Sequence, residues 1–458
     1  MKKLLVLTGA LLFGLALIFA PALHAQSGAP RGPQKDAPVT TATPAPAVPT
    51  PAALPSDGAT LFADADGYTE RKFDEFRRNK VPYSAALEAE VLQQQRELAA
   101  QHAAQLVGRG QLKGADNYYL GLLYMLAGRP LEALPALRRF LADSPDADKA
   151  FLQRTRLVIG TQTASMNQFT EAEAMLTAYA QSQPQTPLEL FRLHNALSNA
   201  YYQSKQLAPG AVHAAAAFAL AKDPQTKFAD ATLRARLVSN SGLALAQFKL
   251  KLKQEAEATA VLEELLRYGL RTPAAHVYND ALDVLVAAGH TDAAWKAFNE
   301  SAATDATAPE IEQIIDWIDQ PPVTLAALRG RVVLLDFWAT WCGPCQVTMP
   351  KLKALHERFK DQGLTVIGMT QLYGRVRNAP LTPAEELGYL RAFKKELHLP
   401  YGFAVSKDGE PDARYGVRNL PTAVLIDKHG HIRYITVGVS STSDDSLNKA
   451  IKKLLAEE

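Results

Sequence analysis

Two patterns of hydrophobic and polar positions divide the 458-residue chain. From about residue 59 to residue 299, apolar residues recur with the spacing of amphipathic helices, and the stretch is rich in Ala, Leu, Gln and Glu. After residue 309, short apolar runs typical of buried strands alternate with helical stretches. The pattern predicts a multidomain protein, with an all-α region over residues 58–308 followed by an α/β domain over residues 309–458.

The order of the elements in the second part indicates a mixed sheet flanked by helices. The predicted strands cover residues 331–339, 364–369, 422–427 and 432–438, and the predicted helices cover residues 342–360, 382–399 and 444–458. Strands that alternate with helices favour parallel pairing, whereas the last two strands are joined by a short turn and favour an antiparallel hairpin.

Small residues repeat at fixed intervals in the helical region. A glycine, an alanine and a proline are spaced twelve residues apart in two successive units: Gly121, Ala133 and Pro145, then Gly160, Ala172 and Pro184. The order resembles tetratricopeptide repeats, in units near 39 residues instead of about 34. Small residues let two antiparallel helices approach closely, so we expect a helical solenoid. Such a solenoid either spaces and shields the rest of the chain or offers a concave surface to a partner or client protein.

The N-terminal residues predict export. A pair of lysines precedes an apolar run from Leu4 to Ala20, and Ala25 offers a cleavage point. This layout predicts a signal peptide over residues 1–25, either cleaved or retained as an anchor, because 17 apolar residues lie at the lower edge for a membrane span. Residues 26–57 are rich in Pro and Ala and are predicted to form a disordered linker. We therefore expect an extracytoplasmic protein of the periplasm or cell envelope.

The stretch FWATWCGPC, residues 337–345, holds the only two cysteines of the chain. Cys342 and Cys345 fall where the first predicted strand leads into a helix, with Gly343 and Pro344 between them. Pro costs no hydrogen bond in a first helical turn, and the helix N-terminus offers N–H groups and a positive dipole end to a thiolate. These features favour Cys342 as the nucleophile toward a disulfide and place Cys345 to resolve the mixed disulfide.

Composition and spacing weigh against other kinds of site. The formal net charge of +2 gives no electrostatic reason to expect nucleic-acid binding. A zinc site needs four ligands, which two cysteines without a second pair or a suitable His motif do not complete, so we expect no metal. Haem attachment needs His after the second Cys, where Gln346 stands. A purely structural disulfide over two intervening residues would constrain almost no loop.

A family resemblance agrees with the redox interpretation. VVLLDFWATWCGPC, followed by Pro350 and much later by YGVRNLPTAVLIDKHG, resembles the thioredoxin superfamily, specifically the extracytoplasmic TlpA/ResA-like disulfide reductases. The resemblance covers about residues 321–458. It implies a thioredoxin fold in which Cys342 attacks the substrate disulfide and Cys345 resolves the intermediate. The redox-active pair itself would be the only cofactor.

The resemblance also implies a client-binding surface. Trp341 would flank the cysteines, and Gly343 and Pro344 between them would face the client. Pro421 would be a cis-proline opposite the cysteines, so that the backbone of Leu420 can pair with an extended client strand.

Asp336, six residues before Cys342, matches the buried acid that thioredoxins use to accept the proton of the resolving cysteine. From the residues alone, Asp336 is equally compatible with a surface position. Two features depart from the family. No lysine lies in the strand 364–371, where thioredoxins often carry a partner for this acid. The insertion after that strand is long, and Tyr373, Arg375 and Arg377 in it either shape the client groove or belong to a simple loop.

We therefore predict an enzyme, a protein-disulfide reductase supplied with electrons by a membrane thiol donor, with client proteins as substrates. The helical repeats would dock a partner or client. Two alternatives stay open: a tetratricopeptide-type binding scaffold with a passive or redox-sensing thioredoxin-like module, and a dithiol oxidase or isomerase. The direction of electron flow depends on the reduction potential, which the Gly-Pro dipeptide and its surroundings set.

Overall fold

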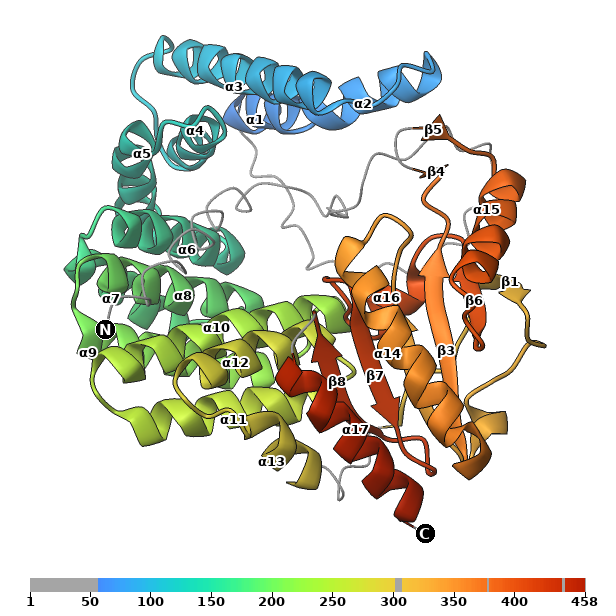
Figure 1. The fold of residues 1–458 in the computed structure, drawn as a ribbon. Helices are drawn as coiled ribbons and strands as arrows, with labels where there is room; N and C mark the ends of the chain where they lie inside the picture. The colour runs from blue at the N-terminus through green and yellow to red at the C-terminus, as the bar shows by residue number, and fades with distance from the viewer. Residues whose placement is uncertain (1–56, 301–306, 377–378, 439–440, 458) are drawn as a thin grey trace. The chain divides into compact units, whose positions relative to one another are not determined.

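The computed structural model describes residues 57–300, 307–376, 379–438 and 441–457. The predicted signal peptide and residues 26–56 of the predicted linker lie outside this part. The chain forms two compact units, one up to Thr163 plus Thr170–Gln185, the other Ala164–Phe169 plus everything from Thr186 on. The predicted boundary at residue 308 therefore falls inside the second unit, which combines helices with a sheet (Figure 1).

The first unit is built from helices. They are α1 (Asp57–Asp66), α2 (Tyr68–Arg78), α3 (Ala85–Val107), α4 (Ala115–Leu126), α5 (Pro130–Asp143), α6 (Lys149–Ser165) and α7 (Phe169–Ala180). The repeated small residues explain how α4 and α5 approach each other: a Cβ on Gly121 would lie 2.4 Å from the side chain of Leu137, and Ala133 is fully buried. The hairpin therefore needs glycine at position 121, as the repeat pattern predicts.

Further helical hairpins open the second unit. They are α8 (Pro187–Gln203), α9 (Leu207–Lys222), α10 (Ala231–Lys251), α11 (Glu255–Arg271), α12 (Ala275–Ala287) and α13 (Ala293–Glu300). Close packing again depends on glycine: a Cβ on Gly242 would lie 2.8 Å from the side chain of Leu265. Among the residues that the structure describes, none of the helices is both long and apolar enough to cross a membrane.

A mixed sheet of six strands, in the order β1-β6-β3-β2-β7-β8, completes the second unit. The strands are β1 (Ile314–Ile318), β2 (Val332–Phe337), β3 (Leu364–Gln371), β6 (Gly402–Ser406), β7 (Thr422–Ile426) and β8 (Ile432–Val437). The central strands β2, β3 and β6 run parallel, and β1, β7 and β8 pair antiparallel to their neighbours. This is a thioredoxin-like sheet, as the sequence predicts. The mixed α/β class and the preceding all-α region are thereby confirmed.

The sequence analysis did not predict every element. Strands β1 and β6 are five residues each, and the insertion forms a two-stranded ribbon, β4 (Arg375–Val376) with β5 (Ala379–Pro380). Strand β7 is also five residues long and was predicted, so length alone does not explain the omission of β1 and β6. The pairing of β6 with β1 at the edge of the sheet joins residues far apart in the sequence.

Different helices cover the two faces of the sheet. On one face, Val333, Leu335 and Phe337 of β2 belong to the same hydrophobic core as residues of the helical hairpins α8–α13. On the other face, Val332 and Leu334 pack with residues of α14 (Gly343–Phe359), α15 (Pro383–Glu396) and α17 (Ser441–Ala456). Figure 1 shows α14 and α17 across this second face, with α11 and α12 beside β8. The hairpins α8–α13 are thus part of the core that supports the sheet.

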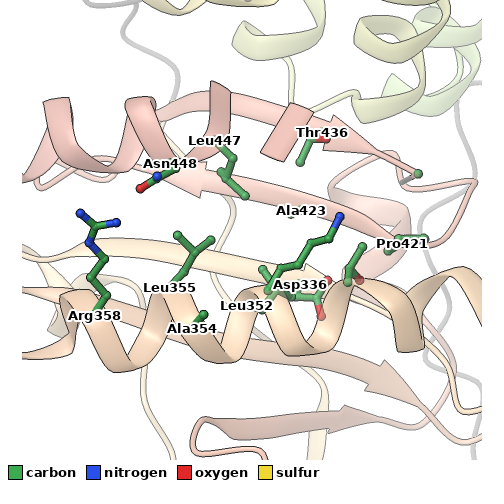
Figure 2. Close-up of a pocket in the computed structure, with 13 residues that line it drawn as sticks. Asp336, Leu352, Ala354, Leu355, Arg358, Pro421, Ala423, Thr436, Leu447 and Asn448 are labelled. Carbon is green, nitrogen blue, oxygen red and sulfur yellow. The ribbon is translucent and has the colours of Figure 1, made fainter. Parts of the chain in front are cut away.

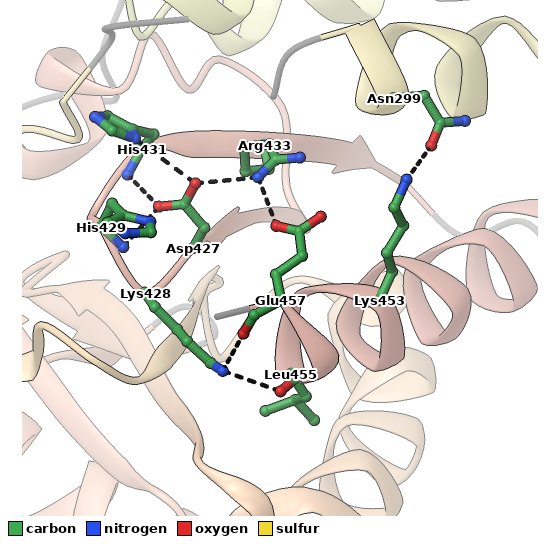
Figure 3. Close-up of polar contacts among 9 residues, drawn as sticks. All are labelled: Asn299, Asp427, Lys428, His429, His431, Arg433, Lys453, Leu455 and Glu457. Carbon is green, nitrogen blue, oxygen red and sulfur yellow. Dashed lines mark hydrogen bonds and ion pairs between the residues drawn. The ribbon is translucent and has the colours of Figure 1, made fainter. Parts of the chain in front are cut away.

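A buried ionic network closes the end of the β7–β8 hairpin (Figure 3). The carboxylate of Asp427 accepts hydrogen bonds from the backbone N–H groups of His429 at 3.0 Å and His431 at 2.9 Å. Arg433, 3% exposed, donates to Asp427 at 3.1 Å and to Glu457 of the segment after α17 at 3.0 Å. The guanidinium also lies 5.2 Å from the ring centroid of Phe298 in α13. Arg433 therefore joins three elements of the second unit.

Replacing Arg433 tests the weight of this network. We expect Arg433→Met to lower the free energy of unfolding by about 3 kcal/mol, because the Asp427 carboxylate stays buried without its cation. The exposed Lys453, which donates to Asn299 at 2.7 Å, supplies the control: Lys453→Met should cost less than about 1 kcal/mol. Urea unfolding followed by tryptophan fluorescence measures both, since all four tryptophans lie in the second unit. Equal losses of unfolding free energy in the two variants would show that burial does not strengthen the interaction between Arg433 and Asp427.

Candidate active site

The two cysteines lie at the junction between β2 and α14. The strand ends at Phe337, and Cys342 is the N-cap residue of α14, with Pro344 in the first turn. Cys342 and Cys345 form a disulfide, and the N–H of Cys345 donates to Sγ of Cys342 at 3.2 Å. The first N–H groups of a helix have no intrahelical partner and favour negative charge, so this position can stabilise a thiolate on Cys342 after reduction.

The two sulfur-bearing residues differ in their access to solvent. Cys345 is completely buried, whereas Cys342 is 4% exposed and lies between Trp341, which is 58% exposed, and the exposed residues Gly343 and Pro344. An incoming thiol or disulfide therefore reaches Cys342 before Cys345. The resemblance implies the same order of attack, which stays a prediction.

Asp336 is buried on the face of β2 that α14 covers. It is 1% exposed, and its Oδ2 atom has no hydrogen-bond partner among the described residues. Burial without a compensating partner raises the pKa of Asp336 to about 7. A carboxyl group with this pKa exchanges protons readily at neutral pH. The surface position, which the sequence left open, does not occur.

Asp336 lines a cavity of about 410 Å³ between α14 and α17 (Figure 2). Pro421, just before β7, and Ala423 of β7 line it as well. Figure 2 shows Asp336 and Pro421 toward one end of the cavity, with Arg358 and Asn448 toward the other. The structure thus brings together two of the predicted site residues, Asp336 and Pro421, that are 85 positions apart in the sequence.

The cavity also contains polar residues that the sequence analysis did not single out. Thr348 and Lys351 of α14 line it together with Leu352 and Leu355. The strand β3 lacks the lysine found in many thioredoxins, and here a lysine of the active-site helix lines the cavity that holds the acid. The spacing of three and four residues among these positions marks one face of a helix, and this signal could have identified Lys351.

The segment around Pro421 leads into β7. The Leu420–Pro421 peptide is cis, Pro421 is buried and Leu420 is half-buried. The carbonyl of Pro421 accepts a hydrogen bond from the N–H of Gly438 at 2.8 Å, which ties this segment to the end of β8.

The insertion contacts the site through an aromatic pair. The rings of Trp341 and Tyr373 lie 5.4 Å apart with an edge-on geometry. The carboxylate of Glu386, 2% exposed, accepts hydrogen bonds at 2.8 Å from the N–H groups of Tyr373 and Gly374 and so fixes the start of the insertion. Arg375 lies in β4, and Arg377 falls outside the described residues. Tyr373 therefore contacts Trp341, the residue that precedes Cys342.

The described residues contain no group of three or more His, Cys, Asp or Glu side chains arranged to hold a metal ion. The chemistry that the site offers within this part of the chain is that of the disulfide, the buried acid and the surrounding backbone. The arrangement can carry out thiol–disulfide exchange, and the carboxyl group of Asp336 can accept a proton nearby.

Comparisons with known proteins find relatives with redox chemistry. A model of the redoxin family matches residues 303–451. The chain is 29% identical over 142 residues to thiol-disulfide oxidoreductase ResA of Bacillus thuringiensis subsp. konkukian, covering 31% of this chain and 73% of ResA. It is 33% identical over 135 residues to protein DipZ of Mycobacterium bovis, covering 29% of this chain and 18% of DipZ.

Solved structures include a thiol:disulfide interchange protein of the thioredoxin family from Chlorobium tepidum, which is 23% identical, with a TM-score of 0.26, and covers 33% of this chain and 96% of that protein. The matched residues contain the disulfide at the strand-to-helix junction and the buried Asp336. Residues 303–451 match the redoxin family, and the protein is a thioredoxin-like oxidoreductase that is similar to the TlpA/ResA-like thiol-disulfide oxidoreductases.

Proposed function

We propose that the protein reduces disulfides of client proteins outside the cytoplasm through the Cys342/Cys345 dithiol. The observation that carries the proposal is the disulfide at the N-terminus of α14, in which Cys342 is 4% exposed beside exposed residues and Cys345 is completely buried. This difference suits a reaction in which Cys342 attacks the client disulfide first and the buried Cys345 then resolves the mixed disulfide.

The reaction transfers two electrons from the dithiol to the client. The thiolate of Cys342 attacks one sulfur of the client disulfide, a mixed disulfide forms, and the other client sulfur leaves as a thiolate. The sulfur of Cys345 then attacks Sγ of Cys342, which releases the second client thiolate and forms the Cys342–Cys345 disulfide. Both client thiolates are protonated, and the enzyme ends in the oxidised state that the structure has.

Asp336 is the proposed acceptor of the proton that Cys345 loses in the second step. Its pKa, raised to about 7 by burial, keeps it close to half ionised at neutral pH, so that it can accept a proton and release it again. The cavity beside Asp336, lined also by Lys351 and Thr348, offers room for the proton to leave toward solvent.

Binding of the client would use the surface around Cys342. The exposed Trp341, Gly343 and Pro344 form the approach, and the backbone of Leu420 before the cis-proline Pro421 would pair with an extended client segment. Beyond the Cys342/Cys345 pair itself, the reaction requires no cofactor. A membrane thiol donor would return the enzyme to its reduced state, and the helical repeats would dock a partner or client. Export by the N-terminal signal would bring the enzyme to the periplasm or cell envelope.

The equilibrium reduction potential of the Cys342/Cys345 pair tests the direction of electron flow. With Gly-Pro between the cysteines, we expect a potential near that of thioredoxin, about −270 mV, when the folded protein is titrated against thiol buffers. A potential near that of the oxidant DsbA, about −120 mV, would instead favour the oxidase alternative.

Trapping of the intermediate tests the roles of the two cysteines. Cys345→Ser should accumulate a mixed disulfide with a reducible client such as insulin, because no internal thiol can attack Cys342. Cys342→Ser is the matched control and should trap nothing, since the remaining thiol of Cys345 is completely buried and lacks the exposed neighbours that surround Cys342. Non-reducing gel electrophoresis with mass spectrometry measures the adduct. Adducts of equal amount in both variants would refute the assignment, and adducts in neither would favour a passive binding module.

The pH dependence of stability and turnover tests Asp336. Because its pKa is about 7 in the folded protein and near 4 when unfolded, the folded state holds an extra proton between these values, and stability falls as pH rises through them. Asp336→Asn should remove this loss, so that its free energy of unfolding at pH 8 exceeds that of the wild type by roughly 4 kcal/mol. Its turnover should fall about a hundredfold.

Asp412, in the short helix α16 (Glu410–Arg414), provides the matched control for Asp336. Burial raises the pKa of Asp412 to about 7 as well, but it does not line the cavity. Asp412→Asn should therefore gain stability at pH 8 and keep its turnover. Urea unfolding and insulin reduction across pH 5 to 9 measure both variants. Retained turnover in Asp336→Asn would show that Asp336 is not the base.

A further inference from the structure

The start of helix α12 meets the chain just before the cis-proline. Ala274, the N-cap residue of α12, caps no N–H with its side chain. The N–H of Ala275 instead donates to the carbonyl of Tyr415 at 2.9 Å, and the N–H of His276 donates to the carbonyl of Gly416 at 3.1 Å. The first N–H groups of a helix need partners from outside it, and here the carbonyl groups of the loop at Tyr415 and Gly416 supply them. Main-chain hydrogen bonds therefore link helix α12 to the segment that precedes Pro421.

The close approach of these two segments depends on small residues. Gly416 has a φ of +61°, and a Cβ at this position would lie 2.8 Å from Cα of Ala274. Ala274 and Ala275 are 2% and 1% exposed, so that little more than backbone lies between the helix and the loop. A residue with a side chain at position 416 would push the two segments apart.

His276 adds a side-chain contact to the same carbonyl. Its Nδ1 lies 3.1 Å from the carbonyl oxygen of Gly416. A carbonyl oxygen only accepts hydrogen bonds, so Nδ1 carries the hydrogen. Burial, followed by the nearby charge of Arg418, lowers the pKa of His276 to about 4, and the ring is therefore neutral at pH 7. His276 binds the loop as a neutral donor from a position that is 6% exposed.

The loop is held from its other side by the sheet. The ring of Tyr415, 1% exposed, lies 5.4 Å from the ring of Phe337, the last residue of β2, and its hydroxyl donates to the carbonyl of Pro309 at 2.5 Å. Tyr415 and Gly416 are thus fixed between α12 and the strand that leads to the cysteines. Only four residues separate Gly416 from Pro421.

We propose that His276 and the first turn of α12 are positioning elements of the redox site, which fix the segment 416–421 and hence the backbone that a client protein pairs with. A segment already ordered before binding costs less conformational entropy when the client binds. The inference rests on the proposed function and gives the helical region a direct part in client recognition. His276 itself does not touch the reacting sulfurs in this assignment.

Substitution of His276 tests the proposal in the full chain. We expect His276→Ala to raise the KM for insulin about fivefold, close to the loss of one hydrogen bond, with kcat, the reduction of the small disulfide cystine and the reduction potential unchanged. Amide hydrogen exchange in residues 416–421 should become faster. His276→Asn should restore the wild-type KM and exchange, because its amide nitrogen can occupy the place of Nδ1. His290, which follows α12 and contacts Thr259 at 3.2 Å, is the control: His290→Ala should change none of these quantities.

A second variant keeps the test decisive if His276→Ala does not fold. Ala275→Pro removes the N–H that binds Tyr415, and proline suits the first position of a helix. It should raise the KM for insulin and the exchange rate in the same way. Unchanged exchange in 416–421 and an unchanged KM in the folded variants would overturn the proposal. If the wild type reduces neither insulin nor cystine, the proposed reductase function fails, and the exchange rates alone decide whether α12 positions the loop.

Discussion

The burial of strand β2 on both faces is the constraint on which the second unit depends. All six of its residues are buried, three facing the helical hairpins and the others facing α14, α15 and α17. A strand covered on both sides needs apolar residues throughout, and Asp336 is the exception. The energetic cost of burying its carboxylate is what raises its pKa to about 7. The same layer of packing that stabilises the sheet therefore raises the pKa of Asp336, the proposed proton acceptor.

The position of the cysteines follows from where β2 ends. The chain leaves the strand at Phe337 and enters α14 at Gly343, so that Cys342 comes to lie at a helix N-terminus beside exposed residues. Cys345, within the first turn of the helix, points into the core and is fully buried. A difference in access of this kind needs only the helix and the sheet beneath it. The oxidoreductase chemistry therefore depends on one strand-to-helix junction and the packing around it.

The helical hairpins of the second unit have a structural role that a separate repeat domain would not have. Their apolar residues share one core with β2, β7 and β8, and α12 donates hydrogen bonds to Tyr415 and Gly416. Removing these hairpins would expose one whole face of the sheet. Partner docking by the helices and redox chemistry by the sheet are thus proposed functions of a single packed unit.

The sequence by itself determined the features that depend on neighbouring residues. Helical periodicity, the small residues Gly121 and Ala133 and the strand-to-helix context of Cys342 are local patterns, and the structure has helices, a close hairpin and the junction where they indicate them. The fold class and the family resemblance were also evident from the motif around the cysteines. The short strands β1 and β6 were not predicted, and their pairing joins residues far apart in the sequence.

Only the tertiary structure decided what depends on residues distant in sequence. The burial of Asp336, the cavity that it shares with Lys351, and the contact of His276 with Gly416 all arise from packing between elements that local patterns do not relate. The local sequence around an aspartate at the end of a strand does not show whether its side chain is buried or exposed, because helices elsewhere in the chain determine its solvation. Local patterns specify which elements form, and long-range packing specifies the environment of each side chain.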